Sequence, residues 1–204
     1  MKASTSETAS EQTPKQQLSI LIVDDETPML ELMSAMLQSF GHTVVARATS
    51  GEEAVRLARE LRPDLIILDV GMPGMDGVTA AEQILSERSV PIIIETGIAQ
   101  EEAIDRASKL DIQSYLIKPF RKEQLQTSVR LAMVRHHKTQ SAKQKIAELK
   151  GEIEVGKIVN RAVELLIGKF GIDRAEAMEK LEAAAQARSC SITDAAKAIS
   201  ATLG

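Results

Sequence analysis

The chain has 204 residues, with 29 Asp and Glu against 25 Lys and Arg, and a single cysteine, Cys190. This slightly acidic balance disfavours a general binder of polyanions, and a lone cysteine excludes an internal disulfide and fits a reducing compartment. No apolar run reaches the length of a membrane span and the N-terminus lacks an apolar signal core, so we expect a cytoplasmic protein without a membrane partner.

Charge and aromatic residues are unevenly distributed along the chain. Residues 1–137 carry 14 Lys and Arg against 20 Asp and Glu, whereas residues 138–204 carry 11 against 9. An acidic first part and a mildly basic second part indicate separate roles. With three Phe, one Tyr and no Trp, the chain is a poor candidate for RNA-recognition or OB-type modules, which stack bases on aromatic side chains.

The first part alternates strands and helices. Residues 1–17 are rich in Ser, Thr, Gln and Glu, which predicts a disordered leader. Short apolar runs then predict strands over 18–23, 43–47, 64–68, 91–94 and 114–117. Five strands alternating with helices predict an α/β fold, a doubly wound five-stranded parallel sheet that binds ligands beyond the carboxyl ends of its strands.

Two helix starts in this region have clear signals. Thr27 before Pro28 predicts a capping residue followed by proline in the first turn. Ser50 with Glu53 forms a capping box ahead of a helix that we expect to end near Leu61.

The second part is predicted to be entirely helical. Residues 121–167 contain no proline, and only Gly151 and Gly156 weaken a continuous helix. Heptad spacing leaves a coiled-coil homodimer open, and the residues concerned are Ile146, Leu149 and Ile153, with Leu125 and Val129 at similar spacing earlier. Gly168 and Gly171 mark the end of this helix, and Asp173 with Glu176 and Ser191 with Asp194 begin two more. We therefore expect a helical linker over 138–157 and a three-helix domain over 158–204.

Polar residues that could take part in chemistry lie at the ends of the predicted strands. Asp24 and Asp25 follow the first strand, Asp69 ends the third, Thr96 the fourth and Lys118 the fifth. In a parallel sheet these side chains converge on one edge, where packed carboxylates are costly unless a cation neutralises them. Mg²⁺ is a suitable cation for such oxygen ligands. With the ion in place, one carboxylate can attack phosphorus. The ammonium and hydroxyl groups can then stabilise the negative charge on the transferred phosphoryl group.

Over residues 18–137 the chain resembles the receiver domain of two-component response regulators, which has a flavodoxin-like fold. The motifs that carry the resemblance are Val23-Asp24-Asp25-Glu26, Leu68-Asp69-Val70-Gly71-Met72-Pro73-Gly74-Met75-Asp76-Gly77, Thr96-Gly97 and Tyr115-Leu116-Ile117-Lys118-Pro119-Phe120. The resemblance implies that a sensor histidine kinase phosphorylates Asp69. It also implies that Asp25, Asp69 and the backbone carbonyl of Gly71 hold Mg²⁺, with Asp24 acting mainly through water.

The same resemblance implies roles for three further residues. Thr96 and Tyr115 would form a switch pair, and Lys118 would contact the phosphoryl group and precede a cis proline bond. Two departures from the family pattern bear on the switch rather than on the chemistry. Glu95 replaces an apolar residue, which is costly if buried unless the carboxylate is paired or exposed by a mobile loop, and Asp111-Ile112 replaces Gly-Ala.

The C-terminal region resembles an ANTAR domain, a three-helix module that binds paired RNA hairpins and prevents transcription termination. The resemblance lies in apolar spacing, carried by Ile158-Val159-Asn160-Arg161-Ala162, Leu165-Leu166-Ile167, Phe170-Gly171-Ile172, Ala175-Glu176-Ala177-Met178, Leu181, Ala185, Ile192 and Ala195-Ala196. Candidate RNA contacts are Arg161, Lys169, Arg174, Lys180, Arg188 and Lys197. Glu164 and Glu182 stand where the family has Gly and Arg, which lowers the attraction to phosphates.

Two functions remain open at this point. The first is a phosphorylation-controlled antiterminator that binds RNA hairpins. The second is a protein-interaction or dimerisation module whose ANTAR-like helices have lost RNA binding, which Glu164 and Glu182 favour. A DNA-binding output is weaker because the last helices lack a basic recognition helix, and an enzymatic output is weakest because no nucleophile–base pair or metal-ligand cluster follows the receiver.

Overall fold

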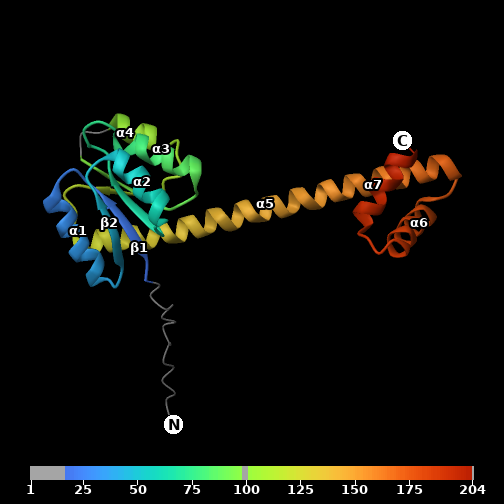
Figure 1. The fold of residues 1–204 in the computed structure, drawn as a ribbon, viewed down its shortest axis with the longest axis horizontal. Helices are drawn as coiled ribbons and strands as arrows, with labels where there is room; N and C mark the ends of the chain where they lie inside the picture. Colours follow the sequence, from blue (N-terminus) through green and yellow to red (C-terminus); the bar gives the residue numbers. More distant parts are fainter. Residues whose placement is uncertain (1–16, 98–100, 204) are drawn as a thin grey trace, which may run out of the picture. The chain divides into compact units, whose positions relative to one another are not determined.

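Five parallel strands build the first part of the chain, in a computed structural model that describes residues 17–97 and 101–203. The sheet has the order β2-β1-β3-β4-β5, and Figure 1 shows β1 beside β2. Its strands are β1 (Ser19–Val23), β2 (Thr43–Ala48), β3 (Leu65–Asp69), β4 (Ile92–Thr96) and β5 (Ser114–Ile117). The predicted parallel sheet is confirmed, with ends shifted by one or two residues, whereas the predicted leader lies outside the described residues apart from Gln17.

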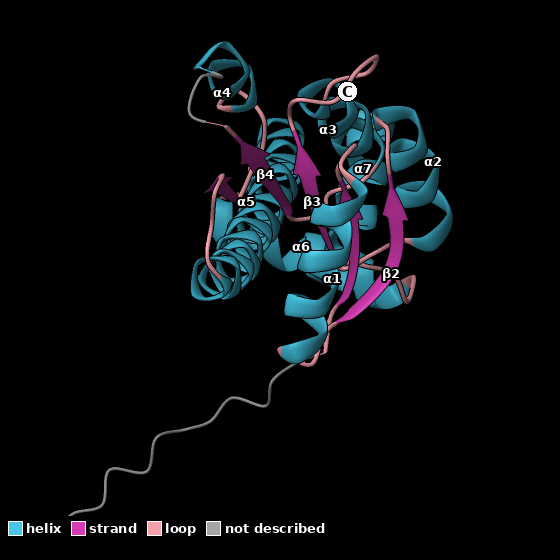
Figure 2. Cartoon of the chain, turned by 90° about the vertical axis from the view of Figure 1, so that its left-hand side faces the viewer, coloured by secondary structure: helices cyan, strands magenta, loops and turns pink. Residues whose placement is uncertain are grey.

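Helices cover both faces of this sheet (Figure 2), which explains why every residue of β3 and β4 is buried. The helices of this part are α1 (Thr27–Ser39), α2 (Gly51–Leu61), α3 (Gly77–Glu87), α4 (Glu101–Ala107) and the start of α5 (Lys122–Phe170). One core cluster joins α2, α3 and α4 to the sheet, and a second joins α1 and α5 to the other face. Leu125 and Val129 belong to this second cluster, so their spacing reflects packing on the sheet and not a coiled-coil seam.

Side-chain caps begin most helices where the sequence predicted them. The Ser50 hydroxyl accepts the amide hydrogen of Glu53 at 3.3 Å, and the Glu53 carboxylate accepts that of Thr49 at 3.1 Å. The prediction for Thr27 was wrong, because α1 is already helical there and Glu26 is the capping residue. The Asp24 carboxylate accepts the Glu26 amide hydrogen at 2.7 Å and turns the chain into the helix one residue earlier.

The chain divides into two compact units, residues 1–138 and residues 139–204. The second unit contains the last part of α5 together with α6 (Arg174–Ala187) and α7 (Ile192–Leu203), and its core is formed mainly by alanine and aliphatic side chains. Asp173 caps α6 by accepting the Glu176 amide hydrogen at 2.9 Å, as predicted. Within the described ranges, no helix combines the length and the apolar character that a membrane crossing requires.

The departure at Asp111-Ile112 is accommodated at the start of β5. The Gln113 side chain donates to the Asp111 carbonyl at 2.6 Å and accepts the Ile92 amide hydrogen at 2.8 Å. These contacts join the amino ends of β4 and β5, at the sheet edge opposite the end of β3. This departure therefore lies away from the predicted acidic site.

Gly77 allows α3 to begin directly against the end of β3. A Cβ atom at this position would lie 1.9 Å from the carbonyl oxygen of Asp69, far inside van der Waals contact. The neighbouring Asp76 caps the helix by accepting the Thr79 amide hydrogen at 2.7 Å. Only glycine can therefore occupy position 77 without displacing Asp69.

We predict that Gly77→Ala destabilises the first unit by about 1–3 kcal/mol, because the added methyl group overpacks the end of β3. Thermal unfolding followed by circular dichroism measures this. Gly151→Ala is the matched control: nothing lies within 4 Å of a Cβ there, and alanine should add about 0.5–1 kcal/mol of helix stability. Equal melting temperatures for Gly77→Ala and wild type would contradict the prediction.

Candidate functional site

Three carboxylates form a row across the carboxyl edge of the sheet. Asp69 is paired in register with Glu95, and Asp24 directly follows Val23, which is paired with Leu68. One oxygen from each of the three acids lies within 4.8 Å of the others, and all three side chains are buried. Because side chains alternate along a strand, this row lies on the face that α1 and α5 cover.

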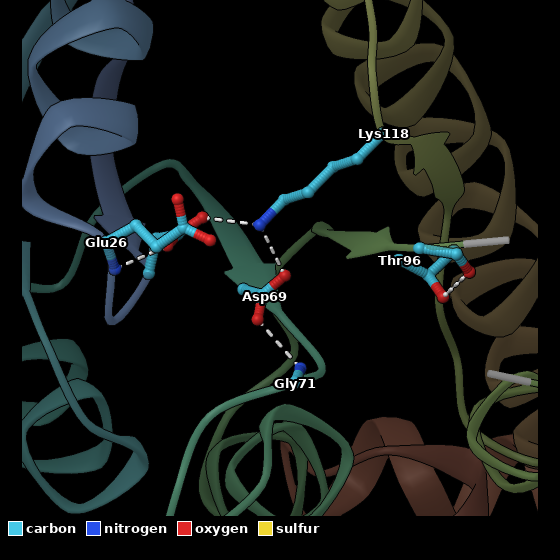
Figure 3. Close-up of polar contacts among 7 residues, drawn as sticks. Glu26, Asp69, Gly71, Thr96 and Lys118 are labelled. Atoms are coloured by element: carbon cyan, nitrogen blue, oxygen red, sulfur yellow. Dashed lines mark hydrogen bonds and ion pairs between the residues drawn. The ribbon is translucent and has the colours of Figure 1, made fainter. Parts of the chain in front are cut away.

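Lys118 is the cation that partly neutralises this row. Its Nζ atom lies 2.6 Å from Oδ2 of Asp24 and 2.7 Å from Oδ1 of Asp69 (Figure 3). Burial alone would lower the pKa of Lys118, but its hydrogen bonds to Asp24 and Asp69, together with the charges of Asp69 and Glu95, raise the pKa above its ordinary value. The lysine is therefore firmly charged, and the peptide bond that follows it, Lys118–Pro119, is cis as the resemblance implied.

Backbone amides hold the remaining oxygens of the two aspartates. Oδ2 of Asp69 accepts the Gly71 amide hydrogen at 2.7 Å, and Oδ1 of Asp24 accepts that of Glu26 at 2.7 Å. Figure 3 shows the Asp69 carboxylate between Lys118 and the loop that contains Gly71. Each aspartate is thus oriented by one backbone contact and one ammonium contact.

The structure places the other predicted residues around this centre. Thr96 ends β4, and its hydroxyl donates to the Gly97 carbonyl at 3.1 Å. Tyr115 lies on β5, partly buried against the cluster on the α2–α3–α4 face, and burial raises its pKa. Asp25 is exposed, and the carboxylates grouped among the described residues are those of Asp24, Asp69 and Glu95.

Glu95 is the member of this site that sequence reasoning missed, since it was noted only as a departure from the family pattern. Its side chain is 0% exposed, and neither carboxylate oxygen has a hydrogen-bond partner among the residues that the structure describes. Burial raises the pKa of Glu95 to about 8; Lys118 opposes this shift, and Asp24 and Asp69 add to it. No local pattern indicated it, because the strand residues before it are all isoleucine; the pairing of Glu95 with Asp69 across the ladder brings it into the site.

The donor set fits a divalent cation. Three buried acidic side chains share one ammonium group, and the Glu95 oxygens have no hydrogen-bond partner in residues 17–97 and 101–203. All these atoms are hard oxygen donors, which Mg²⁺ prefers. The residues present are therefore consistent with the predicted magnesium site.

In the second unit, the predicted RNA-contacting residues are all exposed. They are Arg161, Lys169, Arg174, Lys180, Arg188 and Lys197. Arg174 also donates to Oδ1 of Asn160 at 2.5 Å. Phe170, at the end of α5 beside Lys169, is 57% exposed and is the only aromatic residue after Phe120. Glu164 and Glu182 are exposed too, so the surface carries both signs of charge.

We predict a pH-dependent stability that Glu95 controls. Between its ordinary pKa of 4.5 and the folded value of about 8, the folded chain keeps a proton that the unfolded chain releases. Stability from this group is therefore fully present below about pH 4.5 and is lost as the pH rises towards 8. Without divalent cations, the free energy of unfolding of Glu95→Gln should increase relative to that of wild type by up to about 1.4 kcal/mol per pH unit in this window.

Urea unfolding measures this difference. Tyr115 is the only tyrosine and the chain has no tryptophan, so its fluorescence reports on the first unit alone. Glu31→Gln, an exposed position on α1, is the control and should follow wild type at every pH. A stability difference between Glu95→Gln and wild type that stays constant with pH would speak against a protonated, buried Glu95.

Comparisons with known proteins agree with this arrangement. The response regulator receiver domain matches residues 20–130. The ANTAR domain matches residues 147–199, beginning within the segment predicted as a linker. The transcriptional regulatory protein PdtaR of Mycobacterium tuberculosis is 35% identical over 185 residues, which cover 91% of this chain and 90% of PdtaR.

Solved structures are similar to the first unit. The signal receiver domain of a modulated diguanylate cyclase from Desulfovibrio desulfuricans is 32% identical with a TM-score of 0.57, covering 60% of this chain and 98% of that domain. The receiver domain of AraT from Geobacillus stearothermophilus is 28% identical with a TM-score of 0.53, covering 63% and 99%. Since the receiver match spans more than half of the residues and the similarity to PdtaR nearly all of them, the chain belongs to the response regulators, with a receiver domain followed by an ANTAR domain.

Proposed function

We propose that Asp69 accepts a phosphoryl group from a sensor histidine kinase and that this modification controls the ANTAR domain. The observation that carries the proposal is the Asp69 carboxylate itself. It is held at 2.7 Å by both the Lys118 ammonium and the Gly71 amide, at the strand edge where α/β sheets bind ligands. A buried aspartate between a cation and a backbone donor is oriented for attack on an electrophile.

The transfer would proceed by direct displacement. An oxygen of Asp69 attacks the phosphorus of a phosphohistidine, an O–P bond forms, and the P–N bond breaks with its electron pair going to the departing imidazole. When bound, Mg²⁺ would stabilise negative charge on the phosphoryl group during transfer. Asp25, Asp69 and the Gly71 carbonyl would hold the ion, with Asp24 acting through water.

Lys118 and Thr96 would respond to the new charge. The Lys118 ammonium already contacts the acceptor carboxylate, so it needs only a small movement to meet a phosphoryl oxygen. The Thr96 hydroxyl donates to the neighbouring Gly97 carbonyl and could exchange that contact for a phosphoryl oxygen. Tyr115, partly buried on β5, would turn inward as the hydroxyl moves, which would change the surface formed by β5 and α5.

For the output we favour binding of RNA hairpins in the cytoplasm, with transcription antitermination as the consequence. Six exposed cations and the exposed Phe170 ring support this, since phosphate contacts and base stacking are the means by which proteins hold unpaired RNA. The competing proposal is a protein-interaction or dimerisation module. Exposed Glu164 and Glu182 favour it, as do the exposed Ile146, Leu149 and Ile153, which a second copy could cover.

Phosphorylation by acetyl phosphate with Mg²⁺ tests the acceptor. By intact-mass measurement, wild type should gain one acid-stable, base-labile phosphoryl group, and Asp69→Asn should gain none. Lys118→Met should react about 100-fold more slowly, because the negative charge on the transferred phosphoryl group loses a hydrogen-bond donor. Asp105→Asn, an exposed position on α4, should react like wild type. Equal labelling of Asp69→Asn and wild type would show that another residue is the acceptor.

Salt-dependent RNA binding separates the two outputs. If the ANTAR domain binds RNA, Glu182→Arg should raise the affinity of the phosphorylated chain for a two-hairpin RNA. The affinity should also fall more steeply as the salt concentration rises, because the arginine attracts an RNA phosphate that the glutamate repels. Glu31→Arg makes the same charge change in the other unit and should have little effect. If neither wild type nor Glu182→Arg shifts any hairpin RNA, the protein-interaction proposal is preferred.

A further inference from the structure

Glu95 has an unusual position for an acidic side chain. It lies near the carboxyl end of β4 and is fully buried, and within the described part of the chain neither of its oxygens has a hydrogen-bond partner. A buried carboxylate in this condition is costly, because nothing replaces the water that it has lost. Such a group either destabilises the fold with no compensating role or binds a ligand at the carboxyl edge of the sheet.

The surroundings of Glu95 indicate the charge of that ligand. Its pairing partner across the ladder is Asp69, and an oxygen of each lies within 4.8 Å of the other and of one from Asp24. Lys118 supplies one positive charge, but its ion pairs, at 2.6 and 2.7 Å, are with Asp24 and Asp69. With all three acids ionised, as binding of an ion by all three would require, one ammonium group leaves two negative charges, which a single divalent cation would balance.

The face of the sheet is equally informative. On β4, Ile93 has the same orientation as Glu95 and packs in the cluster with α1 and α5, as do Ile22 on β1 and Ile67 on β3. Asp24, Asp69 and Glu95 each stand two residues beyond one of these isoleucines. The carboxylates therefore continue a layer of aliphatic side chains on the face that α1 and α5 cover, and all three lie at the carboxyl edge of the sheet.

We propose that Glu95 is an additional carboxylate ligand of the receiver's divalent cation, so that this chain binds the ion more tightly than a receiver with an apolar residue at this position. The inference rests on the cation site of the proposed function but concerns a different residue. It explains why both oxygens lack a protein partner, and why an acid is tolerated in a layer that is otherwise aliphatic. It also makes the ion part of the folded structure, since a ligand that binds only the folded chain stabilises it.

Calorimetric titration of the full chain with Mg²⁺ and with Mn²⁺, near neutral pH and without any phosphodonor, tests this inference. Wild type should bind one ion, and both Glu95→Gln and Glu95→Leu should bind it about tenfold or more weakly, a loss typical of disturbed metal sites. Glu95→Asp keeps the carboxylate and should recover part of the affinity. Glu31→Gln, which removes the same charge from the surface of α1, should bind as wild type does.

Thermal unfolding followed by Tyr115 fluorescence gives a second readout that does not depend on calorimetric heats. Saturating Mg²⁺ should raise the melting temperature of wild type more than that of Glu95→Leu, whereas without the ion Glu95→Leu should be the more stable of the two. This order also shows that a loss of affinity does not come from misfolding. A larger ion-induced shift in Glu95→Leu would overturn the inference.

Asp24→Asn separates failure of this inference from failure of the underlying site. If Asp24→Asn weakens ion binding but Glu95→Gln and Glu95→Leu bind as tightly as wild type, Glu95 is no ligand and the cation site of the proposed function stands. If wild type binds neither Mg²⁺ nor Mn²⁺, both proposals fall. Weakened binding in the two Glu95 variants, with Glu31→Gln unchanged, supports the inference.

Discussion

The Lys118 ammonium sits between two buried carboxylates at the edge of a parallel sheet, and the rest of the site depends on this contact. Without it, Asp24 and Asp69 would face each other and Glu95 without the ammonium group that pairs with both aspartates. With it, the carboxylates of Asp24 and Asp69 are oriented, yet a single ammonium group serves three acidic side chains. An excess of acidic groups over cationic ones is what the proposed cation binding and phosphoryl transfer both require.

The fold creates this contact by register rather than by local sequence. Asp69 and Glu95 lie on paired strands and Asp24 directly follows a third, and parallel pairing brings these distant parts of the chain to one level. Gly77 then allows α3 to start against the backbone of Asp69, which fixes the loop that contains Gly71. A small shift in any of these elements would change the distances on which the chemistry depends.

Features set by neighbouring residues could be predicted from the sequence. Ser50 and Asp173 cap their helices as expected, because a capping side chain needs only the amides of the next turn. The strands and the convergence of Asp24, Asp69 and Lys118 were also predictable, since alternating strands and helices imply one carboxyl edge. Thr27 misled the prediction because Asp24, three residues earlier, fixes the start of α1 through Glu26.

Features set by long-range packing could not be predicted in the same way. Ile92, Ile93 and Ile94 are all buried, so the run has no polar and apolar alternation that would reveal which face Glu95 takes. Leu125 and Val129 have a spacing that suits a coiled coil and a sheet-covering helix equally well, because periods of 3.5 and 3.6 do not separate over so few residues. Only the tertiary structure distinguishes them.

A crystal structure of the chain with Mg²⁺ and beryllium trifluoride, a stable mimic of the phosphoryl group, tests the central claim most directly. The account predicts beryllium bonded to an oxygen of Asp69, the Lys118 ammonium on a fluorine atom, and the ion among the neighbouring carboxylates. A structure in which the mimic binds elsewhere, or in which Lys118 points away from it, would contradict the account.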